Sequence, residues 1–231
     1  MQNIVSGLRR FSFYRLQLVL CLAASSAHAQ SQALSAITIG GLAEQLQVGD
    51  MVFIHVDILP FRKIAHDTKS WTNHVGIVID ASGAEPVIAE STFPFSKTGQ
   101  LSKFIRRSKA GRVAVARLNT ELTSLERVKV KEAAFKRLGI FYDTGFNLHS
   151  NRQFCSRYVN EVIHEATGRR IGNIENFQTL FADNPDADLL FWRIWYFGRI
   201  PWMRETITPA SLLNSPDVHV VFDWYTGNAS K

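Results

Sequence analysis

Cysteine is scarce in this sequence, with only Cys21 and Cys155 among 231 residues. If Cys21 leaves with an N-terminal leader, Cys155 has no disulfide partner in the mature chain. An unpaired thiol in an exported protein invites oxidation or mispairing, so its presence favours a chemical role. The alternative is a structural thiol, since free cysteine is among the most buried residue types.

The first residues have the pattern of such a leader. Three arginines precede the apolar stretch 16–24, and Ala27-His28-Ala29 forms a small-x-small cleavage site. The apolar stretch is too short to span a membrane comfortably, and the whole pattern is typical of a secretory signal peptide. We therefore expect residues 1–29 to be a signal peptide and residues 30–231 to form a single domain that is exported to the periplasm.

The sequence has neither a large net charge nor residues with the spacing of a metal site. The leader holds three of the 26 Lys and Arg and none of the 20 Asp and Glu, which leaves the mature chain with 23 basic and 20 acidic residues, a net charge of +3. So small an excess does not indicate a nucleic-acid partner. No pair of ligand-type residues has the short spacing of a zinc motif, and we expect neither a metal nor a cofactor.

The segment around Cys155 predicts a helix with the thiol in its first turn. Ser150 or Asn151 can cap its start, and Gly168 supplies its end. A thiol in a first turn meets unpaired N–H groups and the positive end of the helix dipole, both of which favour the thiolate. Apolar or small residues follow at helical spacing: Phe154, Cys155, Tyr158, Val159, Val162, Ile163 and Ala166.

A second informative stretch reads as two strands, 71–80 and 85–91, joined by a turn near Ser82. A hairpin centred there pairs position 74 with position 90 or 91, which brings His74 opposite Glu90. A carboxylate that accepts a hydrogen bond from one imidazole nitrogen fixes the tautomer of the other, as a catalytic base requires. The alternative is an ordinary polar pair at the end of a sheet.

The remaining segments predict a mixed α+β domain. Strands are expected at 51–56, 112–118 and 218–222, and a short helix at 208–213. The polar connection 60–70 can be read as helix or loop, and its length suggests a covering loop. Thr123 and Glu126 have the spacing of a capping box, so they begin another helix. Its expected apolar stripe is Leu125, Val128, Phe135 and Leu138, and the basic run 103–109 is read as a solvated face or as a site for an anionic substrate group.

The stretch 189–203 is unusually rich in aromatic residues. Such a density can line a hydrophobic substrate groove, or it can touch a membrane surface through Phe191, Trp192, Trp195 and Trp202. The alternative is a strand or cover packed on the core, because large aromatic residues dominate cores.

Several motifs together resemble the circularly permuted papain-like enzymes of the YiiX and YebB kind. The resemblance spans residues 42–222, and its specific part is the order histidine, glutamate, cysteine. The segments that carry it are Val48-Gly49-Asp50, Asn73-His74-Val75-Gly76-Ile77-Val78, Ala89-Glu90-Ser91, Tyr142-Asp143-Thr144-Gly145-Phe146 and Phe154-Cys155-Ser156. It implies an α+β fold in which a small antiparallel sheet or half-barrel packs against helices, with the nucleophile at a helix N-terminus.

The resemblance also implies a chemistry. It assigns Cys155 as nucleophile, His74 as general base and Glu90 as the third member of a triad, and relatives of the family include cell-wall amidases and lipid acyltransferases. We expect a hydrolase that cleaves an amide or ester bond in a peptide-containing or acyl-containing substrate through an acyl-enzyme. The backbone N–H of Cys155, with Gln153 or Asn73, would bind the oxyanion. The alternatives are a thioester-forming acyltransferase and a non-catalytic lipid-binding or peptide-binding protein on the same scaffold.

Overall fold

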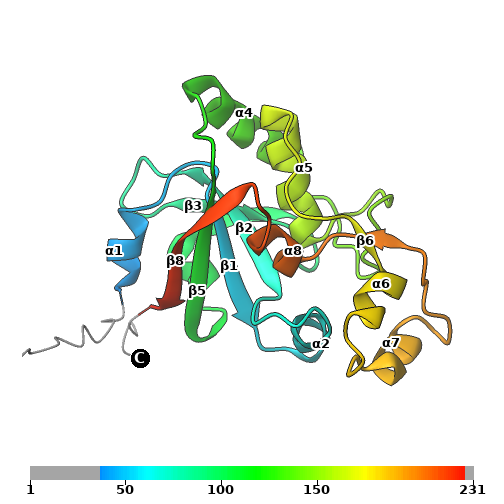
Figure 1. Ribbon diagram of the computed structural model, residues 1–231. Helices are drawn as coiled ribbons and strands as arrows, with labels where there is room; N and C mark the ends of the chain where they lie inside the picture. The colour runs from blue at the N-terminus through cyan, green and yellow to red at the C-terminus, as the bar shows by residue number, and fades with distance from the viewer. Residues whose placement is uncertain (1–36, 227–231) are drawn as a thin grey trace, which may run out of the picture. The chain divides into compact units, whose positions relative to one another are not determined.

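A six-stranded antiparallel sheet in the order β4-β3-β2-β1-β5-β8 forms the centre of the structure, a computed structural model that describes residues 37–226 (Figure 1). The predicted signal peptide, residues 1–29, lies outside the described residues. The strands of the sheet are β1 (Met51–Val56), β2 (His74–Asp80), β3 (Val87–Glu90), β4 (Lys97–Gln100), β5 (Ser108–Leu118) and β8 (Val218–Tyr225). A separate two-stranded ribbon pairs β6 (Glu175–Asn176) with β7 (Glu205–Thr206).

Helices cover both faces of the sheet. The two longest, α4 (Ser124–Phe135) and α5 (Cys155–Thr167), pack on one face, while α1 (Ile39–Ala43) and α3 (Leu101–Ile105) pack on the other. The other helices are α2 (Leu59–Asp67), α6 (Phe177–Ala182), α7 (Leu189–Trp195) and α8 (Pro209–Leu213). The mixed α+β class with an antiparallel sheet against helices, expected from the sequence, is confirmed.

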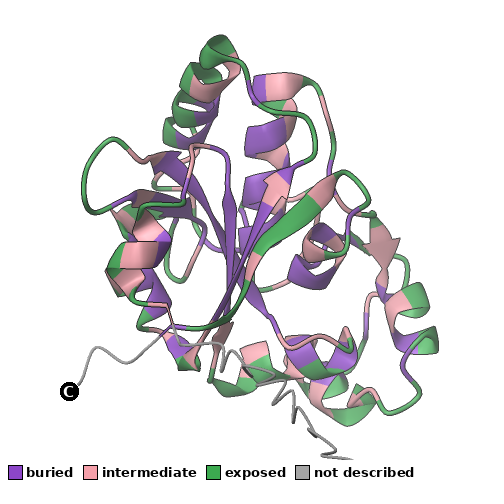
Figure 2. Cartoon of the chain, turned by 60° about the vertical axis from the view of Figure 1, so that its left-hand side comes forward, coloured by how far each residue is buried: buried purple, intermediate pink, exposed green. Residues whose placement is uncertain are grey.

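The apolar run of β1 reflects this two-sided cover. Met51 and Phe53 join the core beneath α4 and α5, whereas Val52 and Ile54 join the core beneath α1 and α3. A strand buried on both faces reads as a continuous apolar run and not as an alternating one. Figure 2 shows the buried residues concentrated in the central strands and on the inner sides of the helices.

Local signals predicted the helix ends well. Thr123 accepts a hydrogen bond from the backbone of Glu126, and the Glu126 carboxylate accepts one from the backbone of Thr123, which completes the capping box of α4. Helix α5 ends at Gly168, whose φ of 76° lies in the left-handed region that favours glycine. All seven residues assigned to the inner side of this helix are buried.

Two local expectations were wrong. The polar connection 60–70, whose length suggested a covering loop, contains helix α2. In α4, Leu125, Val128 and Phe135 are exposed, and the buried side is formed by Val130 and two alanines. On this side, the Tyr158 hydroxyl of α5 donates a hydrogen bond to the Ala134 carbonyl at 2.8 Å.

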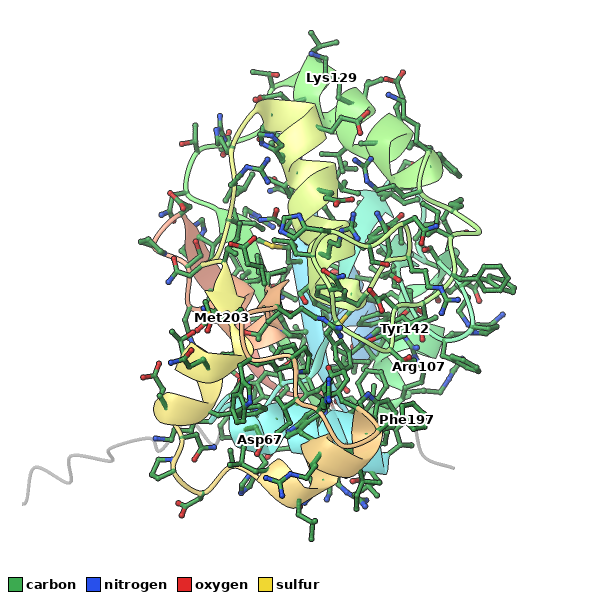
Figure 3. The ribbon with its side chains drawn as sticks, turned by 90° about the vertical axis from the view of Figure 1, so that its right-hand side faces the viewer. Asp67, Arg107, Lys129, Tyr142, Phe197 and Met203 are labelled. Atoms are coloured by element: carbon green, nitrogen blue, oxygen red, sulfur yellow. The ribbon has the colours of Figure 1, made fainter. Side chains whose placement is uncertain are left out.

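The aromatic stretch is helical, and most of its rings turn inward. Trp192 in α7 is only 3% exposed, packs against Phe181 of α6 and donates its indole N–H to the buried carboxylate of Asp67. Figure 3 shows Asp67 beside α7. Phe191 and Trp195 are half-buried, which leaves Trp202 as the exposed member of the four aromatic residues predicted to touch a membrane. Helices α6 and α7 with the loop that follows, residues 177–204, are called the aromatic lobe below.

Candidate active site

Cys155 is the first residue of α5 and is 4% exposed. The residue before it, Phe154, occupies the N-cap position, and no side chain caps the helix. The predicted caps lie elsewhere: Ser150 accepts a hydrogen bond from the backbone of Arg152, in a turn before the helix. The thiol therefore meets the first-turn N–H groups without a competing cap, and those groups have no acceptor within the helix.

His74 and Glu90 meet beneath this thiol, at the ends of two paired strands. The His74 Nε2 lies 2.6 Å from the Glu90 Oε2, and both side chains are buried. The predicted register was two residues off, because the β2–β3 ladder pairs Ile77 with Ala89 and Val78 with Ile88. His74 is thus diagonal to Glu90 and not opposite it, a separation that two long side chains bridge easily.

Arg107, just after α3, is a second partner of the Glu90 carboxylate. Its Nη2 donates to the same Glu90 Oε2 at 2.7 Å, and its guanidinium lies over the Phe104 ring at 4.8 Å. The basic run that contains it was read as a solvated face or a substrate-binding group, so this partner of Glu90 was missed. No local spacing relates residues 90 and 107, and only the sheet brings them together.

Two aromatic rings hold the His74 imidazole in place. Phe104 stacks on it at 5.7 Å between centroids, and Phe61 of α2 approaches edge-on at 5.8 Å. Phe104 lies against β2 because residue 76 is glycine: a Cβ there would come within 2.9 Å of the Phe104 ring and 2.5 Å of the Ile88 side chain. Gly76 therefore permits the stacking that fixes the imidazole.

The charges of the cluster shift its pKa values toward an ion pair. Burial raises the pKa of the Cys155 thiol, but the His74 charge and the N–H groups of Val75 and Ser156 outweigh it and leave that pKa lowered. Burial likewise lowers the pKa of His74, yet Cys155 and Glu90 together raise it to about 9. Glu90 keeps a lowered pKa despite its burial, because His74 and Arg107 stabilise the carboxylate. Both shifts act in favour of the ion pair of a Cys155 thiolate and a His74 imidazolium.

Two buried polar atoms beside the thiol lack hydrogen-bond partners within residues 37–226: the His74 Nδ1 and the Tyr142 hydroxyl. Since Nε2 is bound to Glu90, Nδ1 is the ring nitrogen left for the thiol. Burial and the negative charge of Cys155 raise the pKa of Tyr142 well above its ordinary value, so it remains a proton donor. Tyr142 was missed as a site residue.

The two side chains predicted to bind an oxyanion are engaged elsewhere. The Asn73 amide donates to the carbonyls of Val56 and Phe61 and accepts from the Val56 N–H, so it ties β1 to α2 and has no donor left. Gln153 donates to Glu161, two turns along α5 from the thiol. Backbone bonds of Gln153 to Phe141 and Asp143 still position the residues that lead into Cys155.

An apolar cavity opens at Cys155. The aromatic lobe forms one side of it. Its lining includes Tyr142, Phe146, Phe177, Phe181 and Trp192. A cavity of this character accommodates an apolar group next to the sulfur.

The chain is similar to a family of known proteins. The sequence profile of the family described as "permuted papain-like amidase enzyme, YaeF/YiiX, C92 family" matches residues 45–222. The uncharacterized protein YiiX of Escherichia coli (strain K12) is 24% identical over 185 residues, which cover 80% of this chain and 90% of that protein. A crystal structure described as metalloprotein yiiX from Escherichia coli O157:H7 superposes with a TM-score of 0.72 at 25% identity, covering 78% of this chain and 99% of that one.

The description of that relative as a metalloprotein raises the question of a metal here. Across residues 37–226, no three His, Cys, Asp or Glu side chains converge in a way that could hold an ion. Glu90 already accepts hydrogen bonds from His74 and Arg107 on one oxygen. The described side chains therefore do not fit a metal centre, and the arrangement is instead that of a thiol, an imidazole and a carboxylate in series.

Proposed function

This chain belongs to the permuted papain-like amidase family, and from that membership we propose that it is a hydrolase that uses Cys155 as a nucleophile on an amide or ester bond. The observation that carries the proposal is the state of His74. One ring nitrogen is held by Glu90, the other has no partner within residues 37–226, and the thiol beside it has a lowered pKa. That combination defines an activated nucleophile with an oriented base.

The proposed reaction has two halves. The Cys155 thiolate attacks the substrate carbonyl and forms a carbon–sulfur bond. The tetrahedral intermediate then collapses, the bond to the leaving amine or alcohol breaks, and the His74 imidazolium donates its proton to that group. Water attacks the resulting thioester while His74 accepts one of its protons, and collapse of the second tetrahedral intermediate breaks the carbon–sulfur bond, which releases a carboxylic acid and restores the thiolate and the imidazolium.

Tyr142 is the side chain best placed to stabilise the oxyanion in both halves. Its hydroxyl is buried beside Cys155, remains protonated and lacks another partner within residues 37–226. With the backbone N–H of Cys155 it supplies the two donors that acyl transfer requires. It takes the role that the sequence had suggested for Asn73 or Gln153.

Mass spectrometry of the acylated protein tests this function. We propose incubation with a peptidoglycan peptide, an N-acyl amino acid and a diacyl phospholipid, followed by an acid quench, with Cys21→Ser as the common background. The expected result is an added mass on the peptide that contains Cys155, release of the free acid, and loss of both in Cys155→Ala. Equal product release by the two proteins would contradict a nucleophilic role for Cys155.

A thioester-forming acyltransferase is the second candidate, and the apolar cavity at Cys155 favours it. In that reaction an amine or hydroxyl replaces water in the second half, so the acyl group moves to an acceptor. Addition of glycine ethyl ester to the same incubations separates the two outcomes, since transfer yields an acylated amine in place of the free acid. Capture of a peptide and not a fatty acyl group on Cys155 would contradict this candidate.

Export to the periplasm remains part of the proposal, since it rests on residues 1–29. Within residues 37–226, no helix combines the length and the apolar character needed to cross a bilayer. Comparison of the N-terminus of the protein in a periplasmic extract with that of the full chain tests export. A mature N-terminus at Gln30 is expected.

A further inference from the structure

Helix α7 is apolar on both of its sides. Its inner side carries Trp192, which is 3% exposed and packs in the aromatic lobe. Its outer side carries Leu190 and Ile194, four residues apart, and the chain continues to Phe197; these three side chains are 68%, 70% and 98% exposed. A helix that is apolar all round is normally covered on all sides, by a core or by a membrane. Figure 3 shows Phe197 at the surface of the lobe.

Within α7 and the loop that follows it, residues 189–204, the charged side chains all have one sign, whereas Asp183, Asp186 and Asp188 precede this segment. Residues 189–204 include Arg193, Arg199 and Arg204 and contain no Asp or Glu. Arg193 and Arg199 are exposed, and Arg193 lies in the same stretch of α7 as Ile194. Exposed apolar side chains bordered by arginines and tryptophan are the features of a segment that binds the interface of an anionic bilayer.

The same lobe forms the wall of the cavity at Cys155. Trp192 faces that cavity from within, while Leu190 and Ile194 face outward from the same helix. A helix with its side chains is about 10 Å thick, so a surface that covers the outer side lies about one helix diameter from the apolar cavity. A membrane in contact with α7 would therefore lie within about one helix diameter of the apolar cavity.

From these contacts we infer that the outer side of the aromatic lobe, Leu190, Ile194 and Phe197 with Arg193 and Arg199, docks on an anionic lipid bilayer. The docking surface differs from the four aromatic residues suggested by the sequence, because Trp192 is buried and Phe191 and Trp195 are half-buried. Docking does not require a reaction at Cys155. A catalytically inactive variant therefore tests it separately from the proposed function.

A nitroxide label at a single cysteine measures docking locally. The full chain with Cys21→Ser and Cys155→Ala receives Phe197→Cys in one sample and Lys129→Cys, as a control, in another. Figure 3 shows Lys129 at the opposite end of the structure from Phe197, and both residues are exposed. With vesicles of phosphatidylcholine and phosphatidylglycerol, the label at 197 should become more accessible to oxygen and less accessible to a water-soluble nickel chelate, while the label at 129 should not change.

The local readout separates docking by the lobe from binding by any other segment. Equal water exposure of both labels in the presence of vesicles would overturn the inference, whether or not the protein sediments with them. Dipolar broadening of the signal at 197 without vesicles would also overturn it, since the face would then be covered by a second copy of the chain.

Charge reversal tests the electrostatic part. Each arginine near an anionic surface contributes about fivefold in affinity, so Arg193→Glu combined with Arg199→Glu should weaken binding of the labelled lobe by at least about 25-fold. The matched control reverses two exposed lysines on α4, Lys129→Glu with Lys131→Glu, and should leave the signal at 197 unchanged. Equal effects of the two double variants would contradict a specific role for the lobe.

Discussion

Replacement of Glu90 by Gln tests how the charged cluster activates the thiol. The amide keeps the shape of the carboxylate, and its oxygen can still accept from His74 and Arg107, so the change removes charge with little change in geometry. The pKa of His74 is raised from 6.5 to about 9, which corresponds to about 3 kcal/mol in favour of the imidazolium. Cys155 and Glu90 produce this rise together against the effect of burial.

Loss of a neighbouring opposite charge shifts a pKa by about one unit or more, which is about 1.4 kcal/mol and about a tenfold change in the thiolate population near neutral pH. The rate at which iodoacetamide alkylates Cys155 falls as the pH is lowered and the thiolate is protonated. In Glu90→Gln, we expect the pH midpoint of this fall to rise by about one unit. Glu132→Gln, on the exposed side of α4, is the matched control and should not move it. An unchanged midpoint in Glu90→Gln would refute a role for this carboxylate in activating the thiol.

The pH dependence of the free energy of unfolding tests the same substitution in a second way. The raised pKa of His74 means that its charged form stabilises the fold fully below about pH 6.5 and that this contribution is lost as the pH rises through about 9. The lowered pKa of Glu90 means that its contribution is present above about pH 4.5 and is lost as the pH falls below that. Urea unfolding should therefore show the largest deficit of Glu90→Gln between these limits and a shrinking deficit on either side.

Two further changes test the positioning of the imidazole and the oxyanion donor. Gly76→Ala should cost about 1–3 kcal/mol in urea unfolding and slow alkylation, because its Cβ collides with Phe104, whereas Gly83→Ala in an open turn should do neither. Tyr142→Phe should lower kcat by about 100- to 1,000-fold with little change in KM and leave stability unchanged or raised, since it removes a buried hydroxyl without a partner in residues 37–226. Tyr158→Phe should show the reverse, a loss of about 1 kcal/mol with kcat retained, because its hydroxyl is hydrogen-bonded; equal kcat losses in the two tyrosine variants would contradict an oxyanion role for Tyr142.

Periodicity and end signals predicted the elements that position the thiol. The inner side of α5 and its glycine end depend on spacing within one helix, so they could be found from the residues between Phe154 and Gly168. The pairing of His74 with Glu90 was predicted through a hairpin, although the loop is longer than assumed and the register is shifted by two residues. Both side chains are long enough to meet in either register.

The missed parts depend on contacts between distant segments. Arg107 reaches Glu90 because α3 packs on the sheet, and Tyr142 reaches the thiol because a backbone bridge joins it to Gln153. The buried side of α4 was predicted wrongly. The small Ala133 and Ala134 are buried on that side, and the larger apolar side chains predicted to be buried are exposed. Spacing along the chain carries no signal for any of these.

The ionisation of Cys155 in the resting protein shows directly whether its surroundings activate the thiol. The thiolate absorbs in the far ultraviolet, so the difference in absorbance between the Cys21→Ser protein and its Cys155→Ala counterpart reports it as a function of pH, without depending on access to the buried sulfur. We expect a thiolate to be present already at neutral pH, with the titration midpoint of the Cys155 thiol below the value of about 8.5 for an ordinary cysteine. A thiolate that appears only above about pH 9 would contradict this expectation and would identify Cys155 as a core residue.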